Sequence, residues 1–333
     1  MKKYDVVTLG ELLVDFTMNG TSGQGNPLFE ANPGGAPCNV LSMLQRLGKR
    51  TAFIGKLGED SFGKMLRKAV SEQGIDICNL VMDKEVPTTL AFVHTASDGD
   101  RSFSFYRNPG ADMMLREEEV DTSLLQNARI FHFGSLSMTD VEVEKATKMA
   151  VETAKEAGAL ISFDPNLRPP LWRSLDMAKE KIAYGISQCH ILKISDDEIE
   201  FFTGTSNIDE GVAKIQEEFH TPLICATMGK LGSKAYYNGV QCVECAPFLC
   251  KDTIETTGAG DTFMACVLNM VLEQGLDALD SSRLYEMLQF ANAAASIITT
   301  RKGALKVMPD KQDVLDLIQK MMAVCITEKQ IGI

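Results

Sequence analysis

The chain has 333 residues, of which 45% are hydrophobic and 23% charged, as is typical of a soluble globular protein. Its formal net charge of -12 excludes a broad basic face for nucleic acid, although a few local Arg and Lys side chains can still bind an anionic small substrate. The start, MKKYDVVTLGELLVDF, places Asp5, Glu11 and Asp15 within its apolar stretch, which argues against a signal peptide. No run is long enough for a membrane span. We therefore expect a cytoplasmic protein with no membrane partner, in which the nine cysteines are free thiols.

Apolar runs along the chain predict strands that alternate with amphipathic helices. Strands are expected at 4–16, 51–58, 129–136, 159–166, 189–195 and 222–229. Helices are expected at 39–48, 61–74, 140–158, 196–204, after Gly260, 283–298 and 310–325. This order predicts an α/β fold with a doubly wound, mostly parallel sheet flanked by helices.

Two segments depart from this alternation. Residues 16–33 are rich in Gly, Asn and Pro, and residues 86–108 alternate with period two around the turn SDGD. We predict that segments of approximately 12–32 and 86–108 form a small β-sheet lid over one end of the main sheet. Because no linker separates independent units, residues 1–333 are expected to form a single domain.

The stretch ETTGAGDTFMACVLNMVLEQG, residues 255–275, places glycines directly before a predicted helix. A helix start presents unpaired N–H groups and a partial positive charge, and glycines let an anion approach the backbone closely. Gly258, Ala259 and Gly260 are therefore predicted to form an anion-binding turn. Asp261 could simply cap the helix, but a carboxylate beside an anion site could also accept the proton of an attacking hydroxyl.

A second glycine-containing cluster, NPGGAPCNV, spans residues 32–40. Gly34 and Gly35 permit close backbone approach, although a plain turn is the better explanation of this pair taken alone. Asn39 offers both a donor and an acceptor, and Asp15 is a carboxylate at the end of the first predicted strand. An aspartate together with an asparagine suits the vicinal hydroxyls of a sugar.

The order of these motifs resembles the ribokinase-like (PfkB) carbohydrate kinases. GGAPCNV with GKLGEDSFG resembles the N-terminal signature of that family, and ETTGAGDTF resembles its C-terminal signature, with Glu255 where Asp is usual. The resemblance covers nearly the whole chain. The segments DGDRSFSFYRNPGAD and SFDPNLRPPLW are most like those of fructokinases.

The resemblance implies ATP-dependent transfer of a phosphoryl group to a sugar hydroxyl, with Asp261 as general base and residues 257–260 as the anion hole. It implies sugar or phosphate contacts from Asp15, Gly34, Gly35, Asn39, Phe105, Arg107, Asn166 and Arg168. It implies nucleotide contacts from Lys193, Glu198, Thr227, Gly229, Gly232 and Asn292. The family's Asn-x-x-Glu motif stands here as SDDE, with Ser195 in place of Asn and Glu198 expected to bind Mg²⁺ through water.

The expected reaction is phosphorylation of the 6-hydroxyl of fructose by ATP. A 2-keto-3-deoxygluconate kinase is the alternative within the family, since Arg107 and Arg168 could bind a carboxylate. A non-catalytic, sugar-sensing relative is the alternative from another class. Potassium activation, with Glu255 and Thr257 at the cation, is a further hypothesis, and pairing of lid edges predicts a homodimer.

Overall fold

The computed structural model describes residues 2–95 and 101–331 and contains two sheets. The larger sheet has nine strands in the order β13-β12-β11-β10-β9-β8-β1-β4-β5. Its strands are β1 (Tyr4–Leu9), β4 (Thr51–Gly58), β5 (Asp76–Asp83), β8 (Ala128–Gly134), β9 (Leu160–Asp164), β10 (Ile191–Ser195), β11 (Leu223–Thr227), β12 (Ser233–Tyr237) and β13 (Gln241–Cys245). Strand β12 pairs antiparallel with both β11 and β13, and all other neighbouring strands pair in parallel, which confirms the predicted, mostly parallel, doubly wound sheet.

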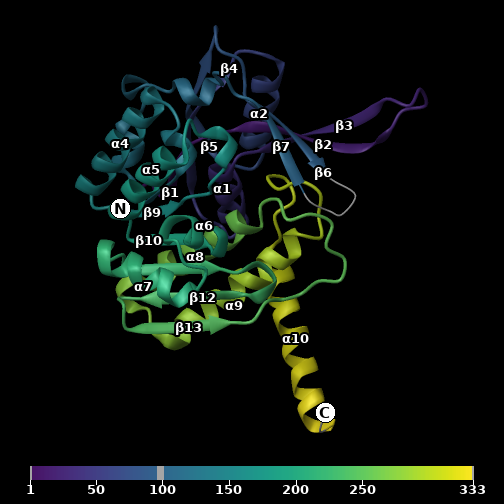
Figure 1. Ribbon diagram of the computed structural model, residues 1–333, viewed down its shortest axis with the longest axis vertical. Helices are drawn as coiled ribbons and strands as arrows, with labels where there is room; N and C mark the ends of the chain where they lie inside the picture. Colours follow the sequence, from purple (N-terminus) through teal and green to yellow (C-terminus); the bar gives the residue numbers. More distant parts are fainter. Residues whose placement is uncertain (1, 96–100, 332–333) are drawn as a thin grey trace.

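Helices cover both faces of the larger sheet (Figure 1). They are α1 (Ala36–Arg46), α2 (Ser61–Glu72), α3 (Thr122–Gln126), α4 (Val141–Glu156), α5 (Leu175–Gln188), α6 (Asp196–Thr203), α7 (Ile208–Phe219), α8 (Ala259–Gln274), α9 (Ser281–Ile298) and α10 (Lys311–Ile331). Neighbouring strand residues enter different cores: Val6 packs with α1, α8 and α9, whereas Val7 packs with α4 and α5. Burial on both sides explains the contiguous apolar runs of the sequence.

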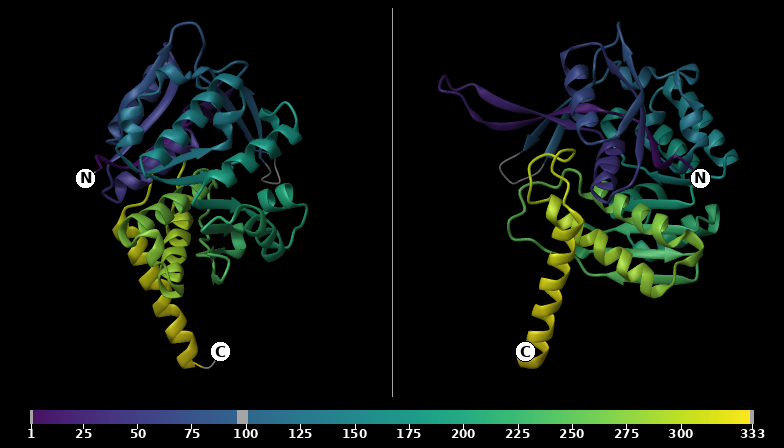
Figure 2. Two further views of the ribbon diagram at one scale, coloured as in Figure 1. Left: turned by 90° about the vertical axis from the view of Figure 1, so that its left-hand side faces the viewer. Right: turned by 180° about the vertical axis from the view of Figure 1, so that it is seen from behind.

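The smaller sheet has four strands in the order β3-β2-β6-β7. They are β2 (Leu13–Thr21), β3 (Pro27–Gly34), β6 (Leu90–Thr95) and β7 (Arg101–Tyr106). Figure 2 shows the β2–β3 hairpin extending well beyond the larger sheet. This sheet corresponds to the predicted lid, and the turn SDGD at 97–100 lies outside the described residues.

One predicted strand is wrong, because residues 4–16 form two strands in different sheets. Strand β1 ends at Leu9 and β2 begins at Leu13, so the chain leaves the larger sheet at Gly10 and enters the lid. A Cβ on Gly10 would lie 2.6 Å from Cγ of Pro37, so only glycine fits there beside α1. A continuous apolar run did not reveal this change of sheet, since both strands are buried at the junction.

Several helix and strand limits also differ from prediction. Helix α1 begins at Ala36 rather than at 39, because Pro37 fits the first helical turn. Strand β5 and helices α5 and α7 were not predicted. The β12–β13 hairpin was also missed, although its turn residues Asn238 and Gly239 both have positive φ, 50° and 67°, as an Asn-Gly turn favours.

The ends of the described chain differ in how they pack. Residues near the N-terminus join the larger sheet through β1, whereas α10 leaves the body of the molecule (Figures 1 and 2). Within the described residues, no helix has the length and apolar character needed to cross a bilayer. The cysteines whose side chains the structure describes are free thiols.

Candidate active site

Two cavities meet at the start of α8. The first, of about 350 Å³, lies beneath the lid sheet, and the second, of about 500 Å³, lies beyond the carboxyl ends of β10 and β11. Both cavities are lined by Asn166, Arg168, Lys193, Thr256 and Gly260. A ligand in one cavity can therefore reach a ligand in the other across the turn that precedes α8.

The turn before α8 has the predicted form, and the helix begins at Ala259, earlier than the expected start after Gly260. Gly258 is its N-cap, with φ of 77°, and no side chain caps the first amides. One first-turn amide is already used, because the N–H of Ala259 donates to the carbonyl of Thr256 at 3.2 Å. A Cβ on Gly258 would lie 2.6 Å from Cβ of Ala304, so the left-handed backbone and the close contact both require glycine.

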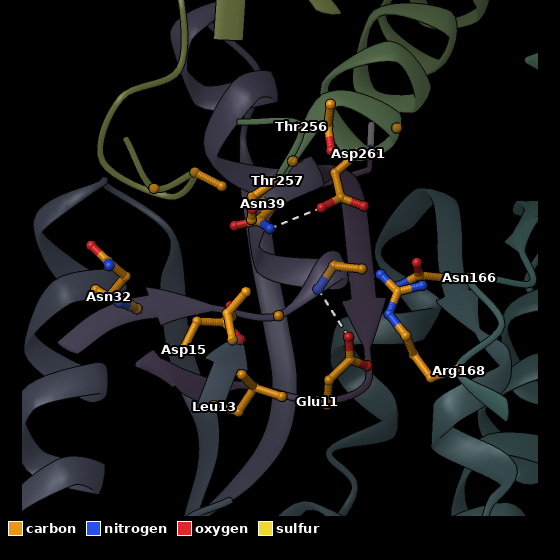
Figure 3. A pocket seen from close by; sticks show the side chains of 18 of the residues that line it. Glu11, Leu13, Asp15, Asn32, Asn39, Asn166, Arg168, Thr256, Thr257 and Asp261 are labelled. Carbon is orange, nitrogen blue, oxygen red and sulfur yellow. Dashed lines mark hydrogen bonds between the residues drawn. The ribbon is translucent and has the colours of Figure 1, made fainter. Parts of the chain in front are cut away.

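Asp261 lies in the first turn of α8 and lines the lid-side cavity. Its carboxylate accepts a hydrogen bond of 2.8 Å from Nδ2 of Asn39 on α1, as Figure 3 shows. Burial raises the pKa of Asp261, although the Asn39 hydrogen bond and the positive charges of Lys193 and Arg168 lower it. A fixed carboxylate with a raised pKa is suited to accept a proton from a hydroxyl.

The lid contributes the opposite wall of the first cavity. Asp15 on β2 points into it, and burial raises the pKa of this carboxyl to about 7. Gly34 does not line the cavity itself, but any Cβ there would collide with the Asp15 carboxylate. Gly35 and Phe105 do line it. The described geometry thus gives Gly34 the role of making room for Asp15.

Asn166 and Arg168 lie on the loop after β9, beside both cavities. Asn166 has the left-handed φ of 44° that asparagine tolerates better than most residues. Figure 3 places Arg168 across the cavity from Asp15. Its guanidinium is therefore placed to meet a ligand that lies between the lid and α8.

The second cavity brings together the residues predicted for the nucleotide. Thr227 ends β11 and Gly229 and Gly232 follow it, while Phe248, Phe263 and Ala295 add apolar surface. Asn292 on α9 also lines this cavity, but its amide is engaged with protein atoms. Its Oδ1 accepts from Ser233 Oγ at 2.9 Å, and its Nδ2 donates to the carbonyls of Cys245 and Ala246 at 3.2 Å.

Glu198 lines the second cavity while its carboxylate binds backbone amides. Oε1 accepts from the N–H of Leu167 and Oε2 from that of Ser195, each at 2.8 Å. Ser195 in turn caps α6 by accepting from the N–H of Glu198 at 3.3 Å. The serine found where the family has asparagine is thus part of a capping box.

Arg107 does not line either cavity. Its guanidinium forms a buried ion pair of 2.7 Å with Asp112 and donates to Thr139 Oγ1 at 2.8 Å and to the carbonyl of Leu136 at 3.0 Å. Only 3% of its side-chain surface is exposed. The structure therefore gives Arg107 a packing role at the end of β7 in place of the predicted substrate contact.

Glu255 and Thr257 line the lid-side cavity next to the turn. Oε1 of Glu255 accepts from the N–H of Gly303 at 2.6 Å, and the N–H groups of Ile254 and Glu255 both donate to the carbonyl of Thr299. The loop that carries Glu255 and Thr257, the residues predicted for a monovalent cation, therefore lies beside the segment 299–303.

Sequence reasoning missed three polar residues here, Glu11, Asn32 and Asp164. Glu11 lies between β1 and β2, lines the first cavity and accepts from the N–H of Ala36 at 2.9 Å, the second dashed line of Figure 3. A carboxylate inside an apolar run was the available signal. Asp164 ends β9, and a carboxylate at the end of a buried strand was the signal there.

Comparison with known proteins agrees with this geometry. Residues 3–311 match the pfkB family carbohydrate kinases. The chain belongs to this family. It is 40% identical to fructokinase-1 of Zea mays over 320 residues, which cover 95% of this chain and 98% of the relative.

Solved structures of family members superpose on most of the kinase. Fructokinase from Xylella fastidiosa with bound ATP has a TM-score of 0.86 and 31% identity, covering 95% of this chain and 99% of that one. Fructokinase from Vibrio cholerae in its form bound to fructose, ADP and calcium ion has a TM-score of 0.85 and 28% identity, with the same coverage. The ribokinase-like fold predicted from the motifs is thereby confirmed.

Proposed function

We propose that this chain is a fructokinase, which transfers the γ-phosphoryl group of ATP to the 6-hydroxyl of fructose. One observation carries the proposal: Asp261 lines the lid-side cavity in the first turn of a helix whose start borders both cavities. Relatives that share the fold over nearly the whole chain include fructokinases, one of them with bound ATP and one with fructose and ADP, and the sequence relative compared above is a fructokinase at 40% identity.

In the proposed reaction, fructose occupies the cavity beneath the lid and ATP the other. Asp261 accepts the proton of the 6-hydroxyl as its oxygen bonds to the γ-phosphorus, while the bond from that phosphorus to the β,γ-bridging oxygen breaks and ADP leaves. The start of α8, Lys193 and Arg168 stabilise the charge on the transferring group. Asn39 holds the base in place, and the lid excludes water.

The residues fit a magnesium ion carried by ATP better than one held by the protein alone. No group of three or more His, Cys, Asp or Glu side chains in the described part of the chain is placed to hold a metal. Because both oxygens of Glu198 accept backbone N–H groups, it would meet Mg²⁺ through water. When bound with the nucleotide, the ion would neutralise phosphate charge.

A potassium site beside the turn is also proposed. Glu255 and the backbone carbonyls of the adjoining segments offer an oxygen-only set of ligands, which suits a hard monovalent cation. Glu255 already joins the two segments through Gly303. Equal activity in potassium-free and potassium-containing buffer would remove this part of the proposal.

Charge in the lid-side cavity favours fructose over 2-keto-3-deoxygluconate. Glu11, Asp15, Glu255 and Asp261 line it against Arg168 and Lys193. Arg107, the second arginine that could have bound a carboxylate, is paired with Asp112 instead. A neutral hexose therefore meets less repulsion here than an anionic sugar acid.

The deciding experiment measures ATP consumption with fructose and with 2-keto-3-deoxygluconate at matched concentrations. We expect turnover with fructose to exceed turnover with the keto acid. The opposite preference would establish the alternative substrate. ATP turnover that stays undetectable with every plausible sugar would instead favour a non-catalytic, sugar-sensing protein.

We also propose that two chains pair through their lids. The face of the lid opposite the lid-side cavity carries a cluster of aromatic rings. The ring of Phe92 is stacked on that of Phe16, with centroids 4.8 Å apart, and it meets the rings of Phe29 and Tyr106 edge-on, with centroids 5.5 Å apart. Yet Met18 and Tyr106 remain 59% and 66% exposed. A second copy of the chain would cover these side chains, and sedimentation that finds only monomers would contradict the proposed dimer.

We propose the cytoplasm as the compartment of this protein, because the exposed thiols of Cys78 and Cys242 suit a reducing environment.

A further inference from the structure

Asp164 is a buried carboxylate that lines neither cavity and has no part in the reaction described above. It is the last residue of β9 and only 3% exposed. Its Oδ1 lies 3.1 Å from Nζ of Lys193 on the neighbouring parallel strand β10. Both side chains are almost inaccessible, at 4% and 8% exposure, so the pair is shielded from solvent.

Lys193 holds an unusual position because it lines both cavities and touches the anion-binding turn. A Cβ on Gly260 would lie 3.1 Å from Nζ of Lys193, so the ammonium group fills the space that a side chain there would need. Asp164 is its hydrogen-bond acceptor within the described residues, which leaves ammonium hydrogens for a ligand at the junction.

Asp164 also organises the loop that follows it. Oδ1 accepts from the N–H of Asn166 at 3.2 Å, which fixes the left-handed conformation of that residue. The next amide, that of Leu167, donates to Glu198, and the carbonyl of Pro165 accepts from Ser135. Hydrogen bonds to Asp164, Glu198 and Ser135 thus fix the loop that carries Arg168.

The electrostatics explain why a lysine buried here needs this partner. Burial disfavours the charged form of Lys193, but Asp164, Glu198 and Asp261 together raise its pKa. Burial raises the pKa of Asp164 to about 7, although the Lys193 charge lowers it. A buried ion pair stabilises a fold no more than well-packed apolar residues of similar volume would, so folding alone does not account for this pair beside the cavities.

We propose that Asp164 is a positioning residue for phosphoryl transfer: its carboxylate holds the Lys193 ammonium group against Gly260, where the transferring phosphoryl group passes between the two cavities. The inference rests on the proposed kinase function. It assigns to Lys193 the contact with the transferring group and to Asp164 the placement of that charge. Asp164 itself touches neither substrate.

The first test compares Asp164→Asn with Asp5→Asn. Both replace a buried aspartate that is ion-paired, but Asp5 pairs with Arg50 and Arg129 at the amino end of β1, away from the cavities. We expect Asp164→Asn to lower kcat by about 10–100-fold, as loss of a well-placed charge does, while KM for fructose changes less than about threefold. Asp5→Asn should keep the wild-type kcat. Equal kcat in Asp164→Asn and wild type would overturn the proposal.

A double-mutant cycle distinguishes positioning from general damage. If Asp164 acts through Lys193, adding Asp164→Asn to Lys193→Met should lower kcat by no more than about twofold beyond the single Lys193→Met change. Fully additive losses would contradict the inference. Should Asp164→Asn fail to fold, Asp164→Glu, which keeps the charge but displaces it, provides the same cycle. Absence of sugar phosphorylation in the wild type would refute the proposed function instead.

Discussion

The anion-binding turn offers a quantitative test through Gly258→Ala. Two penalties follow from the structure. A non-glycine residue at φ of 77° costs about 1–2 kcal/mol in the left-handed region. The new methyl group would also meet Cβ of Ala304 at 2.6 Å, and such overpacking adds about 1–3 kcal/mol. We therefore expect the free energy of unfolding to fall by about 2–5 kcal/mol.

The effect on catalysis should be larger than stability alone explains. To reach a normal carbon–carbon separation of about 3.5–4.0 Å, the turn must move by about 1 Å. A displacement of about 1 Å at a reacting centre can lower turnover by about 10²-fold. The amides of the turn and the Asp261 carboxylate would move together.

The matched control is Gly158→Ala. Gly158 has φ of 73°, close to that of Gly258, but no atom lies within 4 Å of its Cβ position. It should lose stability through backbone strain and keep its kcat. Unfolding is followed by denaturant titration, and kcat is measured at saturating fructose and ATP where each variant is fully folded. Equal kcat values for the two variants would refute the role given to the turn.

Two further predictions concern buried charges. Asp15→Asn should raise KM for fructose yet stabilise the sugar-free protein. The pKa of Asp15 is about 7 in the folded protein, above its value in the unfolded chain. Between about pH 4 and pH 7 the folded protein therefore keeps a proton that the unfolded chain has released, so this carboxyl lowers the free energy of unfolding as pH rises. Asp15→Asn should therefore raise the free energy of unfolding by about 1–4 kcal/mol at pH 8 and leave it unchanged near pH 4. A gain that does not depend on pH would contradict the raised pKa of Asp15. Arg107→Ala should lower the free energy of unfolding by about 3–5 kcal/mol, because it leaves Asp112 buried and unpaired, with KM for fructose changed little in the folded fraction. A large rise in KM with unchanged stability would return Arg107 to the sugar site.

The parts of the fold that could be predicted were those with a local signal. Alternating apolar runs indicated the parallel sheet, and the glycines before Asp261 placed the start of α8 to within two residues. The division of residues 4–16 between two sheets had no such signal. It depends on Gly10 meeting Pro37, a contact between segments 27 residues apart.

Much of the site depends on contacts between distant segments. The hydrogen bond from Asn39 to Asp261 joins residues 222 positions apart, so sequence could suggest both residues without their pairing. Alternation in 86–108 indicated a lid strand but could not show that Arg107 turns inward to Asp112. Asp164 escaped notice because its importance comes from Lys193 on the neighbouring strand.

The most direct measurement is the turnover number of Asp261→Ala with saturating fructose and ATP. Loss of the proton acceptor should lower kcat by about 10²–10⁴-fold, the range usual for a general base, with a smaller effect on ATP affinity. Parallel measurement of nucleotide binding separates the two effects. A kcat near that of the wild type would contradict the assignment of Asp261 as the base.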